Sequence, residues 1–487
     1  MFKSIVEAVF HYAETKPDAF CLADDLTSVT YREYALKIRR FAACFTKIGI
    51  MKSQKIVVEA CQTVDYLAIQ LALQLIGAVF VPVEHNCATE KVCSFIERVN
   101  SDTVITGKTE GYENYNCYTY DSLAEMCALI TPYEVGELPK AEDISEILFS
   151  TGTTGKEKGI VITHKNNIAL AQNVMYGVEM EKDNVEMIPS PLNHSHGLRR
   201  YYANMFCGCS VVLLSSVMNV MKFFKNIEDY GVTAIDLVPS ALTVVLRLSK
   251  TKFSEYQNQL RYIQYGAAPL MEQDKAKVCE LLPNTRMYNF YGSTESGCTC
   301  IYNFNQQNAK SNCIGKPTHN TTLLVVDDDR KPIVSSPDNT GLLATKGDMN
   351  MSEYFEDAKE TEKVLIDGIV YSNDIGYVDG DGDIILLGRK GDVINVAGNK
   401  VSPDEIENVA KEMDDIADCG CIPVPDDKKG SVPKLIVQMS AGTTFDPVKI
   451  RGFLKDRLEP YKVPQYIEQI DKIPRSYNGK LLRKELK

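Results

Sequence analysis

The stretch "STGTTGKEKG" at residues 150–159 carries the residue types that hold phosphate. It contains three glycines, four hydroxyl side chains and two lysines, and it directly follows the apolar residues Ile147, Leu148 and Phe149. Glycine lets backbone N–H groups turn toward an anion, hydroxyls donate hydrogen bonds, and lysine adds a mobile positive charge. The composition favours a phosphate-binding loop, although such a stretch taken alone can also be a solvated turn.

The loop does not follow the pattern of the P-loop in nucleoside triphosphatases. That motif, G-x-x-x-x-G-K-[ST], needs a glycine five residues before the Gly-Lys pair and a hydroxyl after it. In this chain Ser150 stands five residues before Gly155, and Glu157 follows Lys156. Other features of the chain must therefore decide which anion the loop holds.

Composition excludes several functional classes. The 487 residues exceed the roughly 250–300 over which one core keeps growing, so we expect two or three subdomains. The net charge of −12 argues against a nucleic-acid-binding surface, because such surfaces are basic. The first twenty residues lack the apolar region of a signal peptide, and no run approaches the ~18 apolar residues of a membrane span. We therefore expect a cytoplasmic protein.

The cysteines are typical of reduced thiols. There are fifteen, an odd number scattered over the chain, which fits a reducing compartment better than a disulfide framework. None of the three C-x-C pairs has the C-x-x-C spacing of zinc sites, and we expect buried thiols in their place. The pairs are Cys207/Cys209, Cys298/Cys300 and Cys419/Cys421.

Hydrophobic periodicity predicts an α/β protein with a large N-terminal domain. Up to about residue 385, short apolar runs alternate with helix-length segments, which indicates parallel sheets covered by helices. From about Leu324 short strands joined by turns predict a small β-barrel-like part, with a tight hairpin turn at Asp379-Gly380-Asp381-Gly382. After "GRKGD" a small mobile α+β domain of about 95 residues begins, with Pro403 starting its first helix. The expected boundaries are 1–388, a hinge at 389–392, and 393–487.

Several further strings occur in a characteristic order. They are "PLNHSHGL" (191–198), "YGAAPL" (265–270), "YGSTE" (291–295), "YSNDIG" (371–376), "GRKGDVINVAGNKVSPDEIE" (388–407) and "PRSYNGKLLR" (474–483). Together with the loop at 150–159, they resemble the adenylate-forming superfamily of acyl-CoA synthetases, peptide-synthetase adenylation domains and luciferases. The resemblance covers essentially the whole chain. It implies that a carboxylate attacks the α-phosphate of ATP to give an acyl-adenylate and pyrophosphate.

The resemblance assigns the ATP site. The loop at 150–159 is expected to hold the β- and γ-phosphates, Tyr291 to pack on adenine, Thr294 to contact the α-phosphate and Glu295 to bind Mg²⁺. Asp374 is expected to accept hydrogen bonds from the ribose hydroxyls, and Arg389 to reach the ribose or the phosphates. The full expected set is Ser150, Thr151, Gly152, Thr153, Thr154, Gly155, Lys156, Lys158, Gly266, Ala267, Ala268, Tyr291, Gly292, Ser293, Thr294, Asp374 and Arg389.

The loop departs from the family pattern at one position. Glu157 stands where proline is usual in the family. The change loosens the turn and adds a negative charge beside the phosphates. We therefore expect weaker binding of the triphosphate without loss of it.

The C-terminal part is expected to carry catalytic residues that move. By resemblance, Lys480 bridges the carboxylate and the phosphate oxygens during adenylation. The small domain then rotates about a hinge at Gly391, where many relatives carry Asp or Lys, and presents the "NVAGNK" loop, with Gly398 and Lys400, to the incoming thiol. Glycine absorbs large backbone rotations readily, so this alternation is compatible with the sequence.

The expected acyl pocket contains His194, Ser195, Tyr265, Gly266 and Arg199. By resemblance His194 stands at the mouth of the pocket, and Ser195 replaces the aspartate that amino-acid-activating relatives use, which disfavours an amino acid substrate. Tyr265 is expected to restrict the pocket. Arg199 and Arg200 follow directly; one of them could bind a second anionic group of the substrate, as in a dicarboxylic acid, and the alternative is an exposed helix face or a structural ion pair.

The sequence thus predicts an acyl-CoA synthetase that uses ATP, Mg²⁺ and coenzyme A. An enzyme that loads the acyl group onto a separate carrier protein is the alternative within the family, since both acceptors offer the same thiol. A luciferase-type oxygenase is a remote option. A non-catalytic ATP-binding scaffold would be expected to lose Lys480 or Glu295, and both are present.

Overall fold

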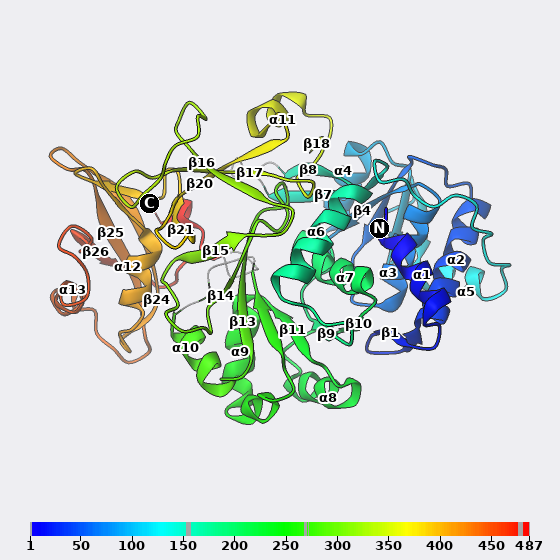
Figure 1. The fold of residues 1–487 in the computed structure, drawn as a ribbon, viewed down its shortest axis with the longest axis horizontal. Coiled ribbons are helices and arrows are strands. Elements are labelled where there is room, and N and C mark those ends of the chain that lie inside the picture. Colours follow the sequence, from blue (N-terminus) through cyan, green and yellow to red (C-terminus); the bar gives the residue numbers. More distant parts are fainter. Residues whose placement is uncertain (1, 152–156, 267–269, 271, 476–480, 487) are drawn as a thin grey trace.

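The computed structural model describes residues 2–151, 157–266, 270, 272–475 and 481–486. Figure 1 shows the N-terminal segments on the right, the C-terminal part on the left, and a lower group of helices and strands between them. Three sheets organise these residues. The expected α/β class, with helix-covered parallel sheets, is confirmed.

The first sheet is mostly parallel. Its strand order is β18-β8-β7-β4-β3-β5-β6, with β3 to β7 parallel where they pair and β8 returning antiparallel along β7. Helix α2 starts after Thr30 because Thr30 and Glu33 form a capping box, which satisfies backbone N–H groups at the start of the helix. The strands are β3 (Lys55–Glu59), β4 (Val79–Val83), β5 (Thr103–Thr106), β6 (Asn116–Thr119), β7 (Ile144–Thr151), β8 (Glu157–Thr163) and β18 (Glu353–Tyr354); the helices near them are α2 (Tyr31–Lys47), α3 (Val64–Leu75), α4 (Thr89–Arg98) and α5 (Tyr120–Ala128).

The second sheet joins a parallel half to an antiparallel half. Strands β1, β10, β9, β11, β12 and β13 are parallel neighbours, and from β14 onward the pairing is antiparallel. The parallel half has β1 (Phe20–Ala23), β9 (Val185–Ile188), β10 (Ser210–Leu213), β11 (Ala234–Leu237), β12 (Tyr262–Tyr265) and β13 (Arg286–Tyr291), with β2 (Ser28–Thr30) antiparallel at its edge. The antiparallel half has β14 (Cys300–Asn303), β15 (Cys313–Pro317), β16 (Thr322–Val326), β17 (Gly341–Lys346), β19 (Leu365–Ile366), β20 (Ile369–Val378) and β21 (Ile384–Arg389).

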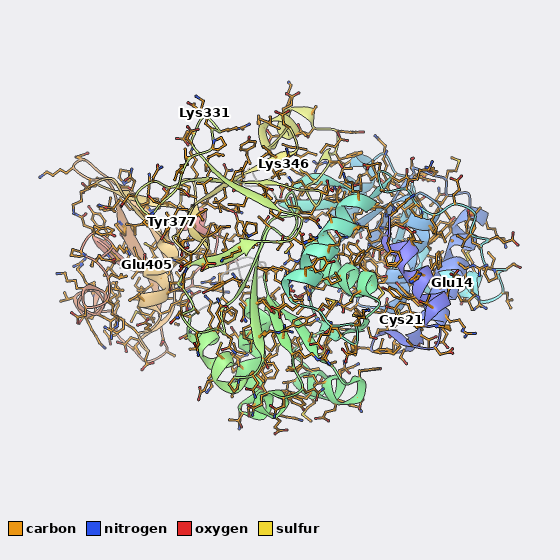
Figure 2. All side chains as sticks on the ribbon, in the orientation of Figure 1. Glu14, Cys21, Lys331, Lys346, Tyr377 and Glu405 are labelled. Carbon is orange, nitrogen blue, oxygen red and sulfur yellow. The ribbon has the colours of Figure 1, made fainter. Side chains whose placement is uncertain are left out.

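Helices α6 (His164–Gly177) and α7 (Ser195–Cys207) lie between the first two sheets (Figure 1). Side chains of α7 such as Leu198 and Tyr202 are buried in the same core as Leu71 of α3 and Leu148 of β7. Figure 2 shows how densely side chains fill this interior. The other helices of the N-terminal part are α1 (Ile5–Thr15), α8 (Val220–Tyr230), α9 (Pro239–Ser249), α10 (Glu272–Leu281), α11 (Ala358–Val364) and the short 3-10 helix at Lys252–Tyr256.

The C-terminal sheet has its own apolar core, which includes Ile394, Ile406, Leu435 and Leu454. Its order is β23-β22-β25-β24, with β26 beside β25. The elements are β22 (Ile394–Val396), β23 (Asn399–Val401), α12 (Pro403–Ala410), β24 (Ile416–Asp426), β25 (Gly430–Met439), α13 (Pro447–Lys455), β26 (Tyr466–Gln469) and a 3-10 turn at Arg483–Glu485. The sequence predicted this α+β unit and the helix that begins at Pro403.

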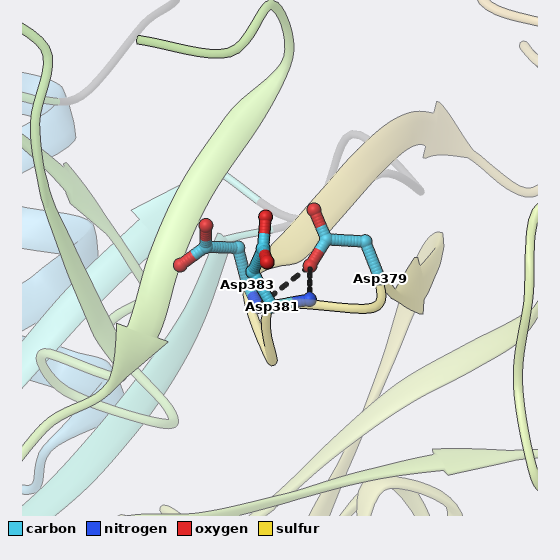
Figure 3. Close-up of side chains that lie close together, drawn as sticks. All are labelled: Asp379, Asp381 and Asp383. Atoms are coloured by element: carbon cyan, nitrogen blue, oxygen red, sulfur yellow. Dashed lines mark hydrogen bonds between the residues drawn. The ribbon is translucent and has the colours of Figure 1, made fainter. Parts of the chain in front are cut away.

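A turn with three aspartates joins β20 to β21, where the sequence predicted a tight hairpin. Asp379 Oδ1 accepts hydrogen bonds from the backbone N–H groups of Asp381 and Asp383, as Figure 3 shows. Lys310 Nζ lies 2.6 to 2.7 Å from a carboxylate oxygen of each aspartate. The single charge of the lysine ammonium thus offsets one of the three negative charges of the cluster.

All fifteen cysteines are free thiols, as predicted. Of the C-x-C residues, Cys207 is half-buried and the other five are buried. Within the residues that the structure describes, no helix is long and apolar enough to cross a lipid bilayer.

Candidate functional site

The candidate site lies at the carboxyl ends of β11, β12 and β13. These strands are parallel neighbours, and ligands of open α/β sheets bind outside the carboxyl ends of such strands. A cavity of about 210 Å³ opens there, with Val238 after β11 and Gly292 after β13 in its wall. Its other wall residues are Ser190, Pro191, His194, Ser195, His196, Arg199, Phe290, Ser293 and Thr294.

The turn after β13 brings Ser293 and Thr294 to this cavity. A side chain at Gly292 is impossible without rearrangement, because an added Cβ would lie 1.9 Å from the carbonyl oxygen of Gly297. The backbone N–H of Ser293 donates to Ser296 Oγ at 3.2 Å, and the N–H of Ser296 donates back to Ser293 Oγ at 3.1 Å. The turn is therefore closed by its own hydroxyls and can hold Thr294 at the cavity.

Glu295 is held on the side of the turn that faces β18. Its Oε1 accepts a hydrogen bond from the Tyr354 hydroxyl at 2.8 Å, and its backbone carbonyl accepts one from Met351 N–H at 2.8 Å. Burial and the neighbouring Glu295 carboxylate raise the pKa of Tyr354, so the tyrosine stays a neutral donor. A fixed carboxylate next to Thr294 suits Mg²⁺, which prefers oxygen ligands near phosphate.

Three expected nucleotide contacts meet: one comes from β13 and two from the paired strands β20 and β21. The Tyr291 hydroxyl at the end of β13 donates to Asp374 Oδ2 of β20 at 2.7 Å. Arg389 of β21 pairs across the strands with Asp374, and its Nε lies 3.5 Å from Asp374 Oδ1. Burial, followed by the charge of Asp374, raises the pKa of Tyr291. A hydroxyl donor, a carboxylate acceptor and a guanidinium therefore lie side by side, and groups of these kinds can bind the hydroxyls and phosphates of a nucleotide.

The β7–β8 hairpin frames the glycine-rich loop. Ser150 pairs with Lys158 across the hairpin, and Lys158 Nζ lies 2.6 Å from Glu360 Oε2. Glu157, the residue that departs from the family pattern, has Oε1 2.8 Å from Lys91 Nζ. Its negative charge is therefore partly compensated within the protein. The side chain of Thr151 and the predicted phosphate contacts Gly152, Thr153, Thr154, Gly155 and Lys156 lie outside the described residues.

The start of α7 supplies the acyl side of the cavity. His194 is the residue before the helix, Ser195 is its first residue, and both line the cavity. Burial lowers the pKa of His194, which favours the neutral imidazole. Gly266 packs tightly behind, because an added Cβ there would lie 2.7 Å from His196 Cε1 and 2.9 Å from Arg199 Nη2. Ala267 and Ala268 lie outside the described residues.

The two adjacent arginines differ completely in their surroundings. Arg200 is fully buried and makes a bidentate pair with Glu186, through Nε at 2.7 Å and Nη2 at 2.9 Å. Arg199 lines the cavity. The hypothesis that either arginine could meet the substrate is therefore corrected for Arg200, whose guanidinium is committed to a structural ion pair.

Tyr265 also differs from the expectation. Its side chain has no exposed surface, its ring packs against Phe304, and its hydroxyl lies 3.7 Å from Met287 Sδ. It belongs to an apolar core that shares no residue with the cavity wall, so the prediction that it restricts the acyl pocket is corrected. His196 and Phe290 line the pocket and were missed. The signal for His196 was its place one helical turn before Arg199.

His196 joins Arg199 to a buried aspartate. Arg199 Nη2 donates to His196 Nδ1, and His196 Nε2 lies 2.9 Å from Asp236 Oδ1. Burial, the largest cause, lowers the pKa of His196, which leaves a neutral ring that accepts at Nδ1 and carries its proton at Nε2. Burial opposes ionisation of Asp236, but His196 and Arg200 nearby keep its pKa below the ordinary value.

The structure describes only some of the residues predicted for the C-terminal part. Gly391 follows β21 with φ +97°, a left-handed conformation that favours glycine, and Gly398 has the same φ in the β22–β23 turn before the exposed Lys400. Lys480 lies outside the described residues. The residues flanking that segment are fixed: Arg475 donates to both carboxylate oxygens of Asp418 at 2.6 and 2.7 Å, and it forms a β-bridge with Leu481.

The chain is similar to known proteins along most of its length. A family model for the AMP-binding enzyme matches residues 9–355, and one for the AMP-binding enzyme C-terminal domain matches residues 405–480. The chain is 26% identical over 488 residues to 4-coumarate:CoA ligase 1 of Petunia hybrida, covering 94% of this chain and 88% of that protein. It is also 26% identical over 495 residues to 2-succinylbenzoate–CoA ligase of Bacillus cereus, covering 100% and 99%. ATP-bound MatB from Rhodopseudomonas palustris has the same fold, with a TM-score of 0.89 at 21% identity, covering 100% of this chain and 98% of that chain.

Proposed function

Because the chain belongs to the AMP-binding enzyme family, we propose that it activates a carboxylic acid with ATP and transfers the acyl group to the thiol of coenzyme A. The enzyme is an acid–thiol ligase of the AMP-forming type. In the first step a carboxylate oxygen forms a bond to the α-phosphorus, the bond to the β-phosphate bridge breaks, and pyrophosphate leaves. In the second step the thiolate attacks the acyl carbon and AMP leaves.

The observation that carries the proposal is a single cavity whose wall includes both the residue expected at the α-phosphate and the residue expected where the carboxylate enters. Thr294 and His194 line the same space, so an α-phosphate at Thr294 and a carboxylate entering past His194 would meet there. The reaction brings an anionic nucleophile to a polyanion, so hydrogen-bond donors must be in place before it starts. The Tyr291, Asp374 and Arg389 group would hold the nucleoside end.

Glu295 is the residue that would hold Mg²⁺. Its carboxylate is oriented by Tyr354 and stands next in sequence to Thr294. When bound, the ion would supply positive charge to the phosphate oxygens. The contribution of the chain itself is to place this carboxylate before the ligands arrive.

The C-terminal part would serve the two half-reactions in turn. We propose domains at 1–388 and 393–487 joined by the hinge at 389–392. Lys480 would bridge the carboxylate and phosphate oxygens during adenylation, because an ammonium that touches both anions lowers their repulsion. Rotation about Gly391 would then bring the turn with Gly398 and Lys400 to the thiol path.

Free coenzyme A is the acceptor that the relatives favour. The Petunia and Bacillus relatives are both named as CoA ligases. A separate carrier protein bearing the same pantetheine thiol is the second candidate. Product analysis separates them: the purified chain is incubated with Mg·ATP, a panel of acids and either coenzyme A or a phosphopantetheinylated carrier. We expect AMP, pyrophosphate and acyl-CoA in equal amounts, whereas an acyl-carrier without acyl-CoA would assign the other acceptor. Absence of AMP with every acid would contradict the proposal.

A further inference from the structure

The acyl side of the cavity contains a buried cation that is incompletely satisfied. Arg199 is 6% exposed and lines the cavity, and its Nε has no hydrogen-bond partner among the described residues. Its guanidinium lies over the Phe290 ring, 5.0 Å from the centroid. A guanidinium offers five N–H donors, and burying them without partners is costly. The known contacts of Arg199 leave donors that a ligand could use.

The carboxylates near Arg199 do not line the cavity, so the positive charge of Arg199 faces it. The buried Asp236 does not line the cavity; it is linked to Arg199 through the ring of His196, and its charge only partly offsets the loss of hydration that lowers the pKa of Arg199. The neighbouring Arg200 is neutralised by Glu186. A ligand in the cavity therefore meets Arg199 directly, while the compensating carboxylates lie behind it.

The same wall has a further buried polar side chain without a well-formed hydrogen bond. Ser190 is 3% exposed and lines the cavity; its hydroxyl lies near Asp236, whose pKa it helps to lower, and no well-formed hydrogen bond engages its Oγ among the residues that the structure describes. Buried polar atoms are rarely left unpaired, so atoms of this kind beside a cavity indicate a polar ligand. The polar set next to Phe290 would be poor surroundings for the end of a purely aliphatic chain.

We propose that Arg199 binds a second carboxylate of the substrate, so that the preferred acids are short dicarboxylates. This inference rests on the proposed function. The reacting carboxylate lies toward Thr294, and the distal carboxylate accepts hydrogen bonds from Arg199, with Ser190 at its side. A guanidinium pairs with carboxylate more strongly than with any neutral group, and the volume of about 210 Å³ suits a short acid. A protonated amine at the distal position would be repelled by Arg199.

The test uses pairs of acids that differ only in the distal group. These are propionate and malonate, butyrate and succinate, and pentanoate and glutarate, with the monomethyl ester of each dicarboxylate as a third member. Pyrophosphate release is measured with Mg·ATP and coenzyme A. For at least one length, we expect the dicarboxylate to exceed both the monocarboxylate and the half-ester by about tenfold or more in kcat/KM, as a charged hydrogen bond allows.

Variants locate the preference at Arg199. Arg199→Met is expected to abolish the preference by losing activity with the dicarboxylate, and Arg199→Lys to keep part of it. Arg32→Met is the control, because Arg32 is an exposed arginine paired with Asp18; it should keep the preference. Loss of activity equally with mono- and dicarboxylates in Arg199→Met would place Arg199 at the reacting carboxylate and overturn the inference.

The outcomes separate this inference from the proposed function. If the unaltered enzyme prefers monocarboxylates or half-esters, the inference is wrong and the proposed function stands. If no acid, including longer and aromatic ones, yields AMP, the proposed function itself fails. Because the half-ester comparison uses the unaltered enzyme, it decides the question even if Arg199→Met does not fold.

Discussion

Several ionisable side chains of this enzyme are buried, and their surroundings differ sharply. Arg199 and Arg200 are neighbours in α7, yet one faces the cavity and the other is neutralised by Glu186. Glu146 of β7 is a third buried ionisable residue, 1% exposed, whose Oε2 accepts hydrogen bonds from the Tyr202 hydroxyl and from the Gln70 amide. Burial raises the pKa of Glu146 to about 7.

The raised pKa of Glu146 predicts a fall in stability with rising pH. Between its ordinary pKa of 4.5 and about 7, the folded chain keeps a proton that the unfolded chain has released. Each pH unit in this window lowers the free energy of unfolding by about 1.4 kcal/mol from this residue, or about 3 kcal/mol in all. Glu146→Gln should remove this slope. Urea unfolding of both proteins at pH 5, 6, 7 and 8 measures it, and curves that stay parallel would refute the assignment.

Next to the cavity-lining Thr294, the carboxylate of Glu295 is predicted to act by binding Mg²⁺. Glu295→Gln retains an oxygen that can accept from Tyr354 but removes the charge. We expect adenylation to fall on the order of a hundredfold, equivalent to about 3 kcal/mol, with partial recovery at high Mg²⁺. Titration of pyrophosphate release with Mg²⁺ checks this. An unchanged Mg²⁺ dependence would remove Glu295 from the metal site.

At the scale of elements, ion pairs hold the chain on both sides of residues 476–480. Arg475 binds Asp418 at the start of β24, and Arg483 contacts Asp404 and Glu407 of α12. Leu486 packs so closely on β24 that an added Cβ at Gly420 would lie 2.4 Å from its Cδ1. These contacts therefore fix the described residues on both sides of the segment that carries Lys480.

The ion pair between Arg475 and Asp418 is predicted to support adenylation but not thioester formation. Arg475→Ala should lower adenylation about tenfold, because the position of Lys480 becomes less restricted, while thioester formation from supplied acyl-adenylate changes little. Arg457→Ala is the matched control in the same part of the chain, since Arg457 stacks on Phe453 and lies 3.4 Å from Glu412. Equal losses in both half-reactions would show that Arg475 acts only on stability.

At the scale of the whole molecule, the sequence predicted which motifs come together better than it predicted how single side chains are oriented. The resemblance assigned Tyr291 to adenine and Asp374 to the ribose of the same nucleotide, and the structure joins the two residues by a hydrogen bond across 83 positions. The sequence could not separate Arg199 from Arg200, because adjacent helical residues point about 100° apart and the sequence does not show which direction faces the cavity. The Lys91 partner of Glu157 depends on packing between distant segments, and no local pattern indicates it.

We predict that the whole molecule adopts two conformations, one for each half-reaction. Lys480→Ala should abolish formation of the acyl-adenylate while sparing thioester formation from supplied acyl-adenylate and coenzyme A, because only the first step brings two anions together. Separate assays of the two half-reactions measure this. If the variant kept both half-reactions, the role assigned to Lys480 would be wrong.

The central claim is that a carboxylate oxygen attacks the α-phosphorus of ATP, and oxygen labelling tests it most directly. The preferred acid is prepared with ¹⁸O in its reacting carboxylate and incubated with Mg·ATP and coenzyme A, and the products are analysed by mass spectrometry. The account predicts one ¹⁸O atom in each AMP formed with acyl-CoA and none in pyrophosphate. Label in inorganic phosphate, or AMP formed without label, would contradict it.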